Sequence, residues 1–254
     1  MEFAAVFNEV NMVSFLLLFF RFAALFIATP IFSHNSIPMN IKASMAFFFA
    51  VVFYASMPPL NIPITIPTVI IAILSEFLLG MVVGIALQLA YNVITFAGGQ
   101  ISFMMGFSMA SAIDPQSGVS MPIISQFLSL LGLMMLFALD LHHWMLLLVD
   151  HSLKSVPLGG FVVTNDFFYY LIHATANMFL VGFIIAFPII ALSWLADVIF
   201  GMLMKTMPQF NLLVIGFPIK ITVAFAIIIA TLTGMMLILK GEVQEAFNAL
   251  EMFF

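Results

Sequence analysis

The stretch FFYYLIHATANMFLVGFIIAFPIIALSWLA (167–196) decides the fold class, because it contains no Asp, Glu, Lys or Arg. About 20 consecutive apolar residues suffice to cross a bilayer as an α-helix. Three further stretches, bounded in turn by Lys42, Glu76, Asp114 and Asp140, also leave 25 or more residues without a charge. The sequence therefore predicts an all-α integral membrane protein with several apolar helices.

The composition of the whole chain agrees with this reading. Of 254 residues, 65% are hydrophobic and 7% are charged, whereas soluble domains carry about 25% charged residues. A membrane β-barrel would show alternating segments of about ten residues, but the apolar runs here are continuous. The N-terminus has no basic region and no small-residue cleavage site, so we expect no cleavable signal.

Charge and cysteine content exclude several classes of function. The chain has no cysteine, which rules out disulfides and thiolate metal sites. Its net charge is −5 and it has no basic cluster, which argues against nucleic acid and against polybasic recognition of lipid headgroups. We expect no cofactor.

Six apolar segments form one membrane-embedded unit with no soluble domain. The second is short for a crossing and resembles a re-entrant or protein-buried helix. We expect the third segment to end at Gly98-Gly99. The fifth should begin at a cap near Thr164-Asn165-Asp166 and be broken by Pro188. A polar loop should cover 150–165. The segments are about 13–31, 43–57, 68–97, 122–149, 167–204 and 212–239, with KTMPQFN (205–211) interrupting the chain before the last.

The chain ends in an amphipathic helical pattern. After Lys240, the apolar residues Val243, Phe247, Leu250 and Phe254 recur at helical spacing, opposite three glutamates. This pattern predicts a further protein contact, because its anionic face disfavours binding to acidic lipid.

Arg21 and Glu76 are the two ions deepest within apolar runs. Such residues usually pair or face water, so we hypothesise that each is neutralised by a polar partner inside an assembly, or by the other. The alternative is that one or both snorkel or lie outside the bilayer. Gly80 and Gly84 form a GxxxG pattern, which predicts close helix packing and no chemistry.

The histidines do not form a recognisable metal motif. His142, His143 and His151 lie near a span end beside Asp140 and Asp150, but HExxH is absent. Neighbouring His142 and His143 should point to different helix faces, so we interpret these rings as interfacial groups beside Trp144 and expect no metal site. Motifs GxSxG, Walker A and GxGxxG are also absent, and the chain is not predicted to be an enzyme.

GFSMASAIDPQSGVSMP (106–122) is the most polar stretch in the first half of the chain. It is either a solvent loop or a polar element placed at membrane depth. Four methionines flank or enter it, namely Met104, Met105, Met109 and Met121. Methionine suits surfaces that mould to varied partners, although a chain with 20 methionines will also cluster some by chance.

Three stretches of the sequence carry short motifs. RFAALFIATPIFSHNSIPMNIK (21–42) carries an arginine followed by P-x-F and S-x-P. GGQISFMMGFSMASAIDPQSG (98–118) carries G-x-Q, then glycine-phenylalanine and D-P. MPQFNLLVIGFPIK (207–220) joins P-Q-x-N to G-x-P-x-K. Together they resemble the FliR family of flagellar export-gate proteins, whose injectisome relatives are called SctT, and the order of motifs and apolar segments agrees across nearly all of the chain.

The resemblance implies a fold and a set of partners. Members form the core of the type III export gate with FliP and FliQ, contact FlhB, and pass unfolded flagellar proteins across the bacterial inner membrane at the basal body. Their helices are broken or paired into hairpins. By resemblance, residues 1–165 are FliP-like and residues 166–254 are FliQ-like, and six apolar segments need not make six crossings of the lipid.

The resemblance also assigns a pore plug to residues 107–120. Ser and Gly give this plug loop little fixed structure, Asp114-Pro115 favours a turn, and Phe107, Met109 and Ile113 supply apolar contacts that hold it shut. The plug residues are Phe107, Ser108, Met109, Ala110, Ser111, Ala112, Ile113, Asp114, Pro115, Gln116, Ser117 and Gly118.

Other residues are assigned to assembly with partner subunits. Pro208, Gln209 and Asn211 are expected to form a helix-interrupting turn whose side chains cap backbone groups beside a partner. The full set is Arg21, Glu76, Gly80, Gly84, Pro208, Gln209, Asn211, Gly216, Pro218 and Lys220.

Two other classes of function compete with an export subunit. A secondary transporter would use Glu76 or Asp114 as an ion site, but it would usually show interrupted helices in two repeated halves, which are not apparent. An intramembrane enzyme would need a nucleophile or metal constellation, which the motifs do not supply.

Overall fold

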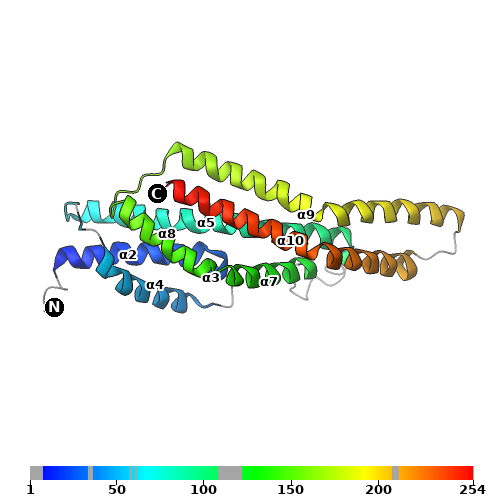
Figure 1. The fold of residues 1–254 in the computed structure, drawn as a ribbon, viewed down its shortest axis with the longest axis horizontal. Helices are drawn as coiled ribbons and strands as arrows, with labels where there is room; N and C mark the ends of the chain where they lie inside the picture. The colour runs from blue at the N-terminus through cyan, green and yellow to red at the C-terminus, as the bar shows by residue number, and fades with distance from the viewer. Residues whose placement is uncertain are drawn as a thin grey trace. The chain divides into compact units, whose positions relative to one another are not determined.

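The computed structural model describes residues 8–33, 37–57, 59–60, 62–107, 122–207 and 212–253, and within these residues the chain is helical with no strand (Figure 1). The helices are α2 (Glu9–Ala28), α3 (Pro30–Ser33), α4 (Met39–Phe53), η1 (Tyr54–Ser56), α5 (Ile66–Met104), α7 (Ile123–Ala138), α8 (Leu141–Ser155), α9 (Asn165–Thr206), η3 (Leu212–Gly216) and α10 (Phe217–Phe253).

Helix length and apolarity confirm the predicted membrane class. Among the described residues, four helices are long and apolar enough to cross a bilayer: α2, α5, α9 and the helix that ends at Phe253. A fifth span is formed if α7 and α8, which are separated by a bend, cross together. The short second segment is also confirmed, since α4 has only 15 residues.

The chain forms two compact units, each assembled from separated parts of the sequence. The first unit comprises Met1–Ala90, Leu136–Ala174 and Val243–Phe254, and the second comprises Tyr91–Met135 and Thr175–Glu242. Helices α5, α7, α9 and α10 therefore contribute residues to both units. The expected division into a FliP-like part and a FliQ-like part stays a prediction.

Aromatic packing joins α2 to α4 in the first unit. Phe22 stacks on Phe49 at a ring-centroid distance of 5.9 Å and meets Phe53 edge-on at 5.2 Å. The side of α4 that faces α2 carries fully buried Ala46 and Ala50. These small residues let the two helices approach closely, as small residues do at membrane helix interfaces.

Hydroxyl groups join α5 to α7 in the second unit. Ser125 Oγ donates a hydrogen bond to the carbonyl of Thr95 at 2.7 Å, and Tyr91 Oη donates to the carbonyl of Ser129 at 2.7 Å. Gly98 lies against the α7 backbone, because a Cβ placed there would stand 2.6 Å from Ser125 Cα. The two helices are therefore in backbone contact at this point.

The predicted helix end at Gly98-Gly99 is wrong, since α5 continues to Met104. Gly98 serves close packing against α7, and its neighbour Gly99 meets nothing within 4 Å. The chain leaves the helix at Gly106, which has a φ of 87° and lies against Phe217. A left-handed backbone at a glycine is a common way to end a helix.

The segment predicted over 122–149 is apolar and helical, but the helix is interrupted at Leu139–Asp140. Asp140 has a φ of 56° and is the only non-glycine residue with positive φ in the part of the chain that the structure describes. Aspartate tolerates this left-handed conformation better than most residues. Helix α8 then continues to Ser155, so the loop is shorter than the expected 150–165.

The C-terminal half follows the sequence pattern more closely. Helix α9 begins at Asn165 as expected, but it continues through Pro188, so the predicted break there is wrong. It ends at Thr206, within the predicted interruption. Beyond Lys240, Val243, Phe247 and Leu250 are buried and Glu245 is exposed, which confirms the amphipathic pattern of the C-terminal segment.

Adjacent glycines on α5 give a matched test of this packing. We expect Gly98→Ala to lower the free energy of unfolding by about 1–3 kcal/mol, because the added methyl group must displace the α7 backbone. Gly99→Ala should leave stability unchanged or raise it by about 0.5–1 kcal/mol, because alanine is the better helix former. Thermal unfolding of the purified chain in detergent measures both, and equal stability of the two variants would contradict the packing role.

Candidate functional site

Arg21 on α2 and Glu76 on α5 form an ion pair whose two side chains have no solvent exposure. Arg21 Nε donates to Glu76 Oε2, and Arg21 Nη2 donates to Glu76 Oε1 at 3.0 Å. This bidentate arrangement is the strongest geometry available to a guanidinium and a carboxylate.

Two further groups complete the hydrogen bonding of this pair. Arg21 Nη1 donates to Ser152 Oγ on α8 at 3.0 Å, and Ser152 Oγ in turn donates to the carbonyl of Val149 at 2.8 Å. The backbone N–H of Gly159 donates to Glu76 Oε1 at 2.7 Å. Glycine is required at 159, because its φ is 76° and a Cβ would stand 2.8 Å from that of Ala72. We call Arg21, Glu76, Ser152 and Gly159 the buried ion network.

The buried ion network shows how the charges of Arg21 and Glu76 are neutralised. Each neutralises the other inside this chain, and neither side chain snorkels to solvent. Ser152 and Gly159 were not predicted to belong to this network. Both lie in the polar loop expected over 150–165, but nothing in the sequence linked Gly159 to a carboxylate 83 residues earlier.

The two glycines of the GxxxG pattern pack against α2, beside the buried ion network. A Cβ at Gly80 would meet the carbonyl oxygen of Arg21 and stand 2.8 Å from the Cβ of Ala24. A Cβ at Gly84 would collide with Ala28 at the end of α2. Both glycines therefore let α5 contact α2 within the chain, which brings Glu76 within reach of Arg21.

Lys220 also has its partner within the chain. Its Nζ lies 2.8 and 2.9 Å from the two carboxylate oxygens of Asp197, and this pair joins α10 to α9 in the second unit. Lys220 is 9% exposed and Asp197 is 56% exposed. Nearby, Gly216 is buried and Pro218 is exposed. The assignment of these residues to a contact with another subunit stays a prediction.

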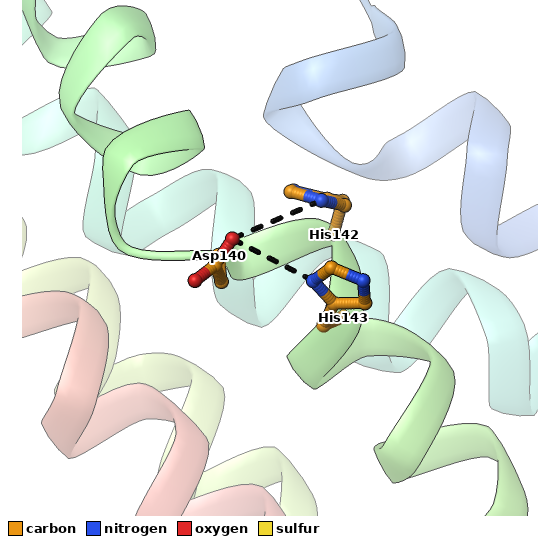
Figure 2. Close-up of side chains that lie close together, drawn as sticks. All are labelled: Asp140, His142 and His143. Atoms are coloured by element: carbon orange, nitrogen blue, oxygen red, sulfur yellow. Dashed lines mark ion pairs between the residues drawn. The ribbon is translucent and has the colours of Figure 1, made fainter.

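A cluster of Asp140, His142 and His143 lies at the break between α7 and α8 (Figure 2). Asp140 Oδ1 is 4.0 Å from His142 Nε2 and 3.6 Å from His143 Nδ1. The expected divergence of the two rings is not observed, since their centroids lie 4.3 Å apart. Both histidines occupy the first turn of α8 and lean back toward Asp140 (Figure 2).

The remaining predicted site residues lie mostly outside the described residues. Of the plug loop, only Phe107 is described, and it is half-buried directly after Gly106. Pro208, Gln209 and Asn211 are also outside the described residues. Their roles therefore stay predictions.

Charge removal tests the buried ion network. We expect Arg21→Met and Glu76→Gln each to lower the free energy of unfolding by about 3–5 kcal/mol, because each leaves one buried charge unpaired. The double variant should recover most of this loss, since the glutamine introduced by Glu76→Gln retains an acceptor for the Gly159 N–H. Thermal unfolding and yield in detergent measure the effect.

The exposed pair Lys154–Asp150 provides the control. Lys154→Met should change stability by no more than about 1 kcal/mol, as surface ion pairs do. A double variant no more stable than the worse single variant would contradict direct pairing of Arg21 with Glu76.

Comparison with known proteins gives the same family throughout. Residues 12–246 match the model of bacterial export proteins, family 1. The chain is 30% identical to flagellar biosynthetic protein FliR of Bacillus subtilis (strain 168), over 90% of this chain and 89% of that protein. It is 28% identical to flagellar biosynthetic protein FliR of Escherichia coli (strain K12), over 91% and 88%.

A more distant relative extends the match. Flagellar biosynthetic protein FliR of Aquifex aeolicus (strain VF5) is 24% identical over 97% of this chain and 95% of its own length. With its membrane-length helices, the chain is a multi-pass protein of the bacterial inner membrane and a component of flagellar export. The chain belongs to the bacterial export proteins of family 1, and the resemblance to the FliR family is confirmed.

Proposed function

We propose that the chain is a non-catalytic subunit of the flagellar type III export gate, which forms with FliP and FliQ the channel for unfolded flagellar proteins and contacts FlhB. The observation that carries this proposal is the family match over residues 12–246 together with the names of the relatives. The partners and the channel follow from the family resemblance.

Uncovered apolar surface supports assembly with other membrane proteins. Of the most apolar 18-residue stretch of the last helix, only 17% is buried within the chain. The corresponding buried share is 33% for α9 and 50% for α5. Helix α4 is too short to span a bilayer, yet it exposes the large side chains Phe47, Phe48 and Val52. Partner subunits would cover such a surface where lipid does not reach.

The helices on either side of the proposed plug loop pack against each other. Helix α5 ends shortly before Phe107, and α7 begins at Ile123. Gly98 and Ser125 bring these two helices into backbone contact near the loop. A loop carried on two fixed helices can leave and re-enter a pore without disturbing the helices, which is what a displaceable plug requires.

The structure disfavours Glu76, one of the two residues that a secondary transporter would use as an ion site. Both carboxylate oxygens of Glu76 already accept hydrogen bonds, from Arg21 and from Gly159, and its side chain is fully buried. A site that binds and releases an ion needs access and free ligand atoms. Asp114, the other candidate, lies outside the described residues.

Deletion of residues 110–117 tests the plug. The complex with FliP and FliQ should still assemble, because the helices on either side are retained, and ion conductance of the closed gate should rise. Met109→Ser/Ile113→Ser should also raise conductance, because it removes apolar contacts of the closed loop.

Ser111→Ala/Ser117→Ala is the matched control within the same loop and should leave the closed gate tight. Conductance in planar bilayers, with co-purification as the check on assembly, measures all three variants. Unchanged conductance in an assembled deletion complex would refute the plug assignment.

The turn at 208–211 provides a test of assembly. Gln209→Ala/Asn211→Ala should reduce co-purification with FliP and FliQ, because these side chains are proposed to cap backbone groups beside a partner. Thr206→Ala is the control, since the Thr206 hydroxyl bonds only to carbonyls of its own helix turn among the described residues. Full recovery of the complex with the double variant would refute the proposed role.

A further inference from the structure

We propose that Asp140, His142 and His143 form a binding site for one Zn²⁺ ion at the break between α7 and α8. The three side chains come from four consecutive residues and gather on one side of the turn (Figure 2). The site goes beyond the proposed export function and does not depend on it.

The positions of the three ligand atoms suit a metal ion. Each of Asp140, His142 and His143 offers one ligand atom, and these three atoms all lie within 4.8 Å of one another. Ligand atoms of a tetrahedral zinc site, with bonds of about 2.0–2.1 Å, stand ~3.3 Å apart. Asp140 Oδ1 is 3.6 Å from His143 Nδ1 and 4.0 Å from His142 Nε2. Small side-chain rotations would therefore bring the three ligand atoms to coordinating distance of one ion.

Exposure allows those rotations and leaves room for water. The side chains of Asp140 and His143 are each 67% exposed, and that of His142 is 38% exposed. His142 Nδ1 is buried and has no hydrogen-bond partner among the described residues. A metal ion would therefore reach His142 through Nε2, the nitrogen that faces Asp140 (Figure 2).

The donor set selects the class of metal. Two imidazoles and one carboxylate are typical ligands of zinc sites that keep one position for water. Imidazole nitrogen favours Zn²⁺ over Mg²⁺ and Ca²⁺, which prefer oxygen ligands.

The backbone leaves the Asp140 carboxylate free for this role. The backbone carbonyl of Asp140 accepts from the N–H groups of His143 and Trp144, at 2.9 and 3.2 Å, and so begins helix α8. The Asp140 side chain makes no capping hydrogen bond. On one flank, the His142 ring lies 6.0 Å from that of Phe137 between centroids, which limits where the imidazole can go.

Zinc titration of the full chain tests the site. The chain is purified with a tag that contains no histidine, stripped of metal, and titrated with ZnCl₂ in a calorimeter. We expect one Zn²⁺ per chain, with affinity at least about tenfold weaker in Asp140→Asn, His142→Gln and His143→Gln. Asparagine at 140 keeps the left-handed backbone available.

His151→Gln/His173→Gln is the matched control, because it removes two exposed histidines of the same unit and should bind Zn²⁺ as the wild type does. MgCl₂ serves as the control cation and should not bind. Absence of zinc binding by the wild type through the millimolar range, or equal binding by all variants, would overturn the proposal.

A footprinting measurement needs no variant. Zn²⁺ should protect His142 and His143 of the wild-type chain from carbethoxylation, as read by mass spectrometry, and leave His151 and His173 reactive. Equal modification of all four histidines with and without Zn²⁺ would overturn the site even if the variants failed to fold. Neither measurement involves export, so its failure would leave the proposed function unaffected.

Discussion

The pairing of Arg21 with Glu76, away from all solvent, is the constraint on which the first unit depends. A charge at the centre of a bilayer costs about 2.5–3.5 kcal/mol on insertion scales, and a buried pair is tolerated only when its hydrogen bonds are met. The network meets them by bringing α2, α5, α8 and the turn at Gly159 to one point. Gly80 is small for the same reason, since its helix must touch the backbone beside Arg21.

The second unit is held together by contacts of a different kind. Hydroxyl groups of Tyr91 and Ser125 donate to backbone carbonyls of a neighbouring helix, and Gly182 lies against Phe96. Such contacts are typical of helices that associate without a hydrophobic driving force. Lys220 joins α10 to α9 through Asp197. Other large apolar side chains, among them Phe183, Phe187 and Leu195, face outward, where lipid or another protein must cover them.

Sequence patterns predicted the features that depend on a single segment. Uncharged runs indicated the membrane helices, and helical spacing indicated the buried face of the C-terminal segment. Several features that depend on a distant neighbour were missed or wrong. The glycine pair at Gly98 suggested the end of a helix, but Gly98 packs against Ser125 within the helix. Likewise, depth in an apolar run identified Arg21 and Glu76, whereas Ser152 and Gly159 belong to residue types too common to single out.

The lengths of α5 and α9 have a consequence for how the chain meets its membrane. With 39 and 42 residues, they extend about 58 and 63 Å at 1.5 Å per residue, roughly twice the ~30 Å of a hydrocarbon core. Even a tilt of about 40° leaves each well over the thickness of the hydrocarbon core. Hydrophobic mismatch of this size exceeds what bilayer deformation absorbs, so part of each helix must lie outside the hydrocarbon core.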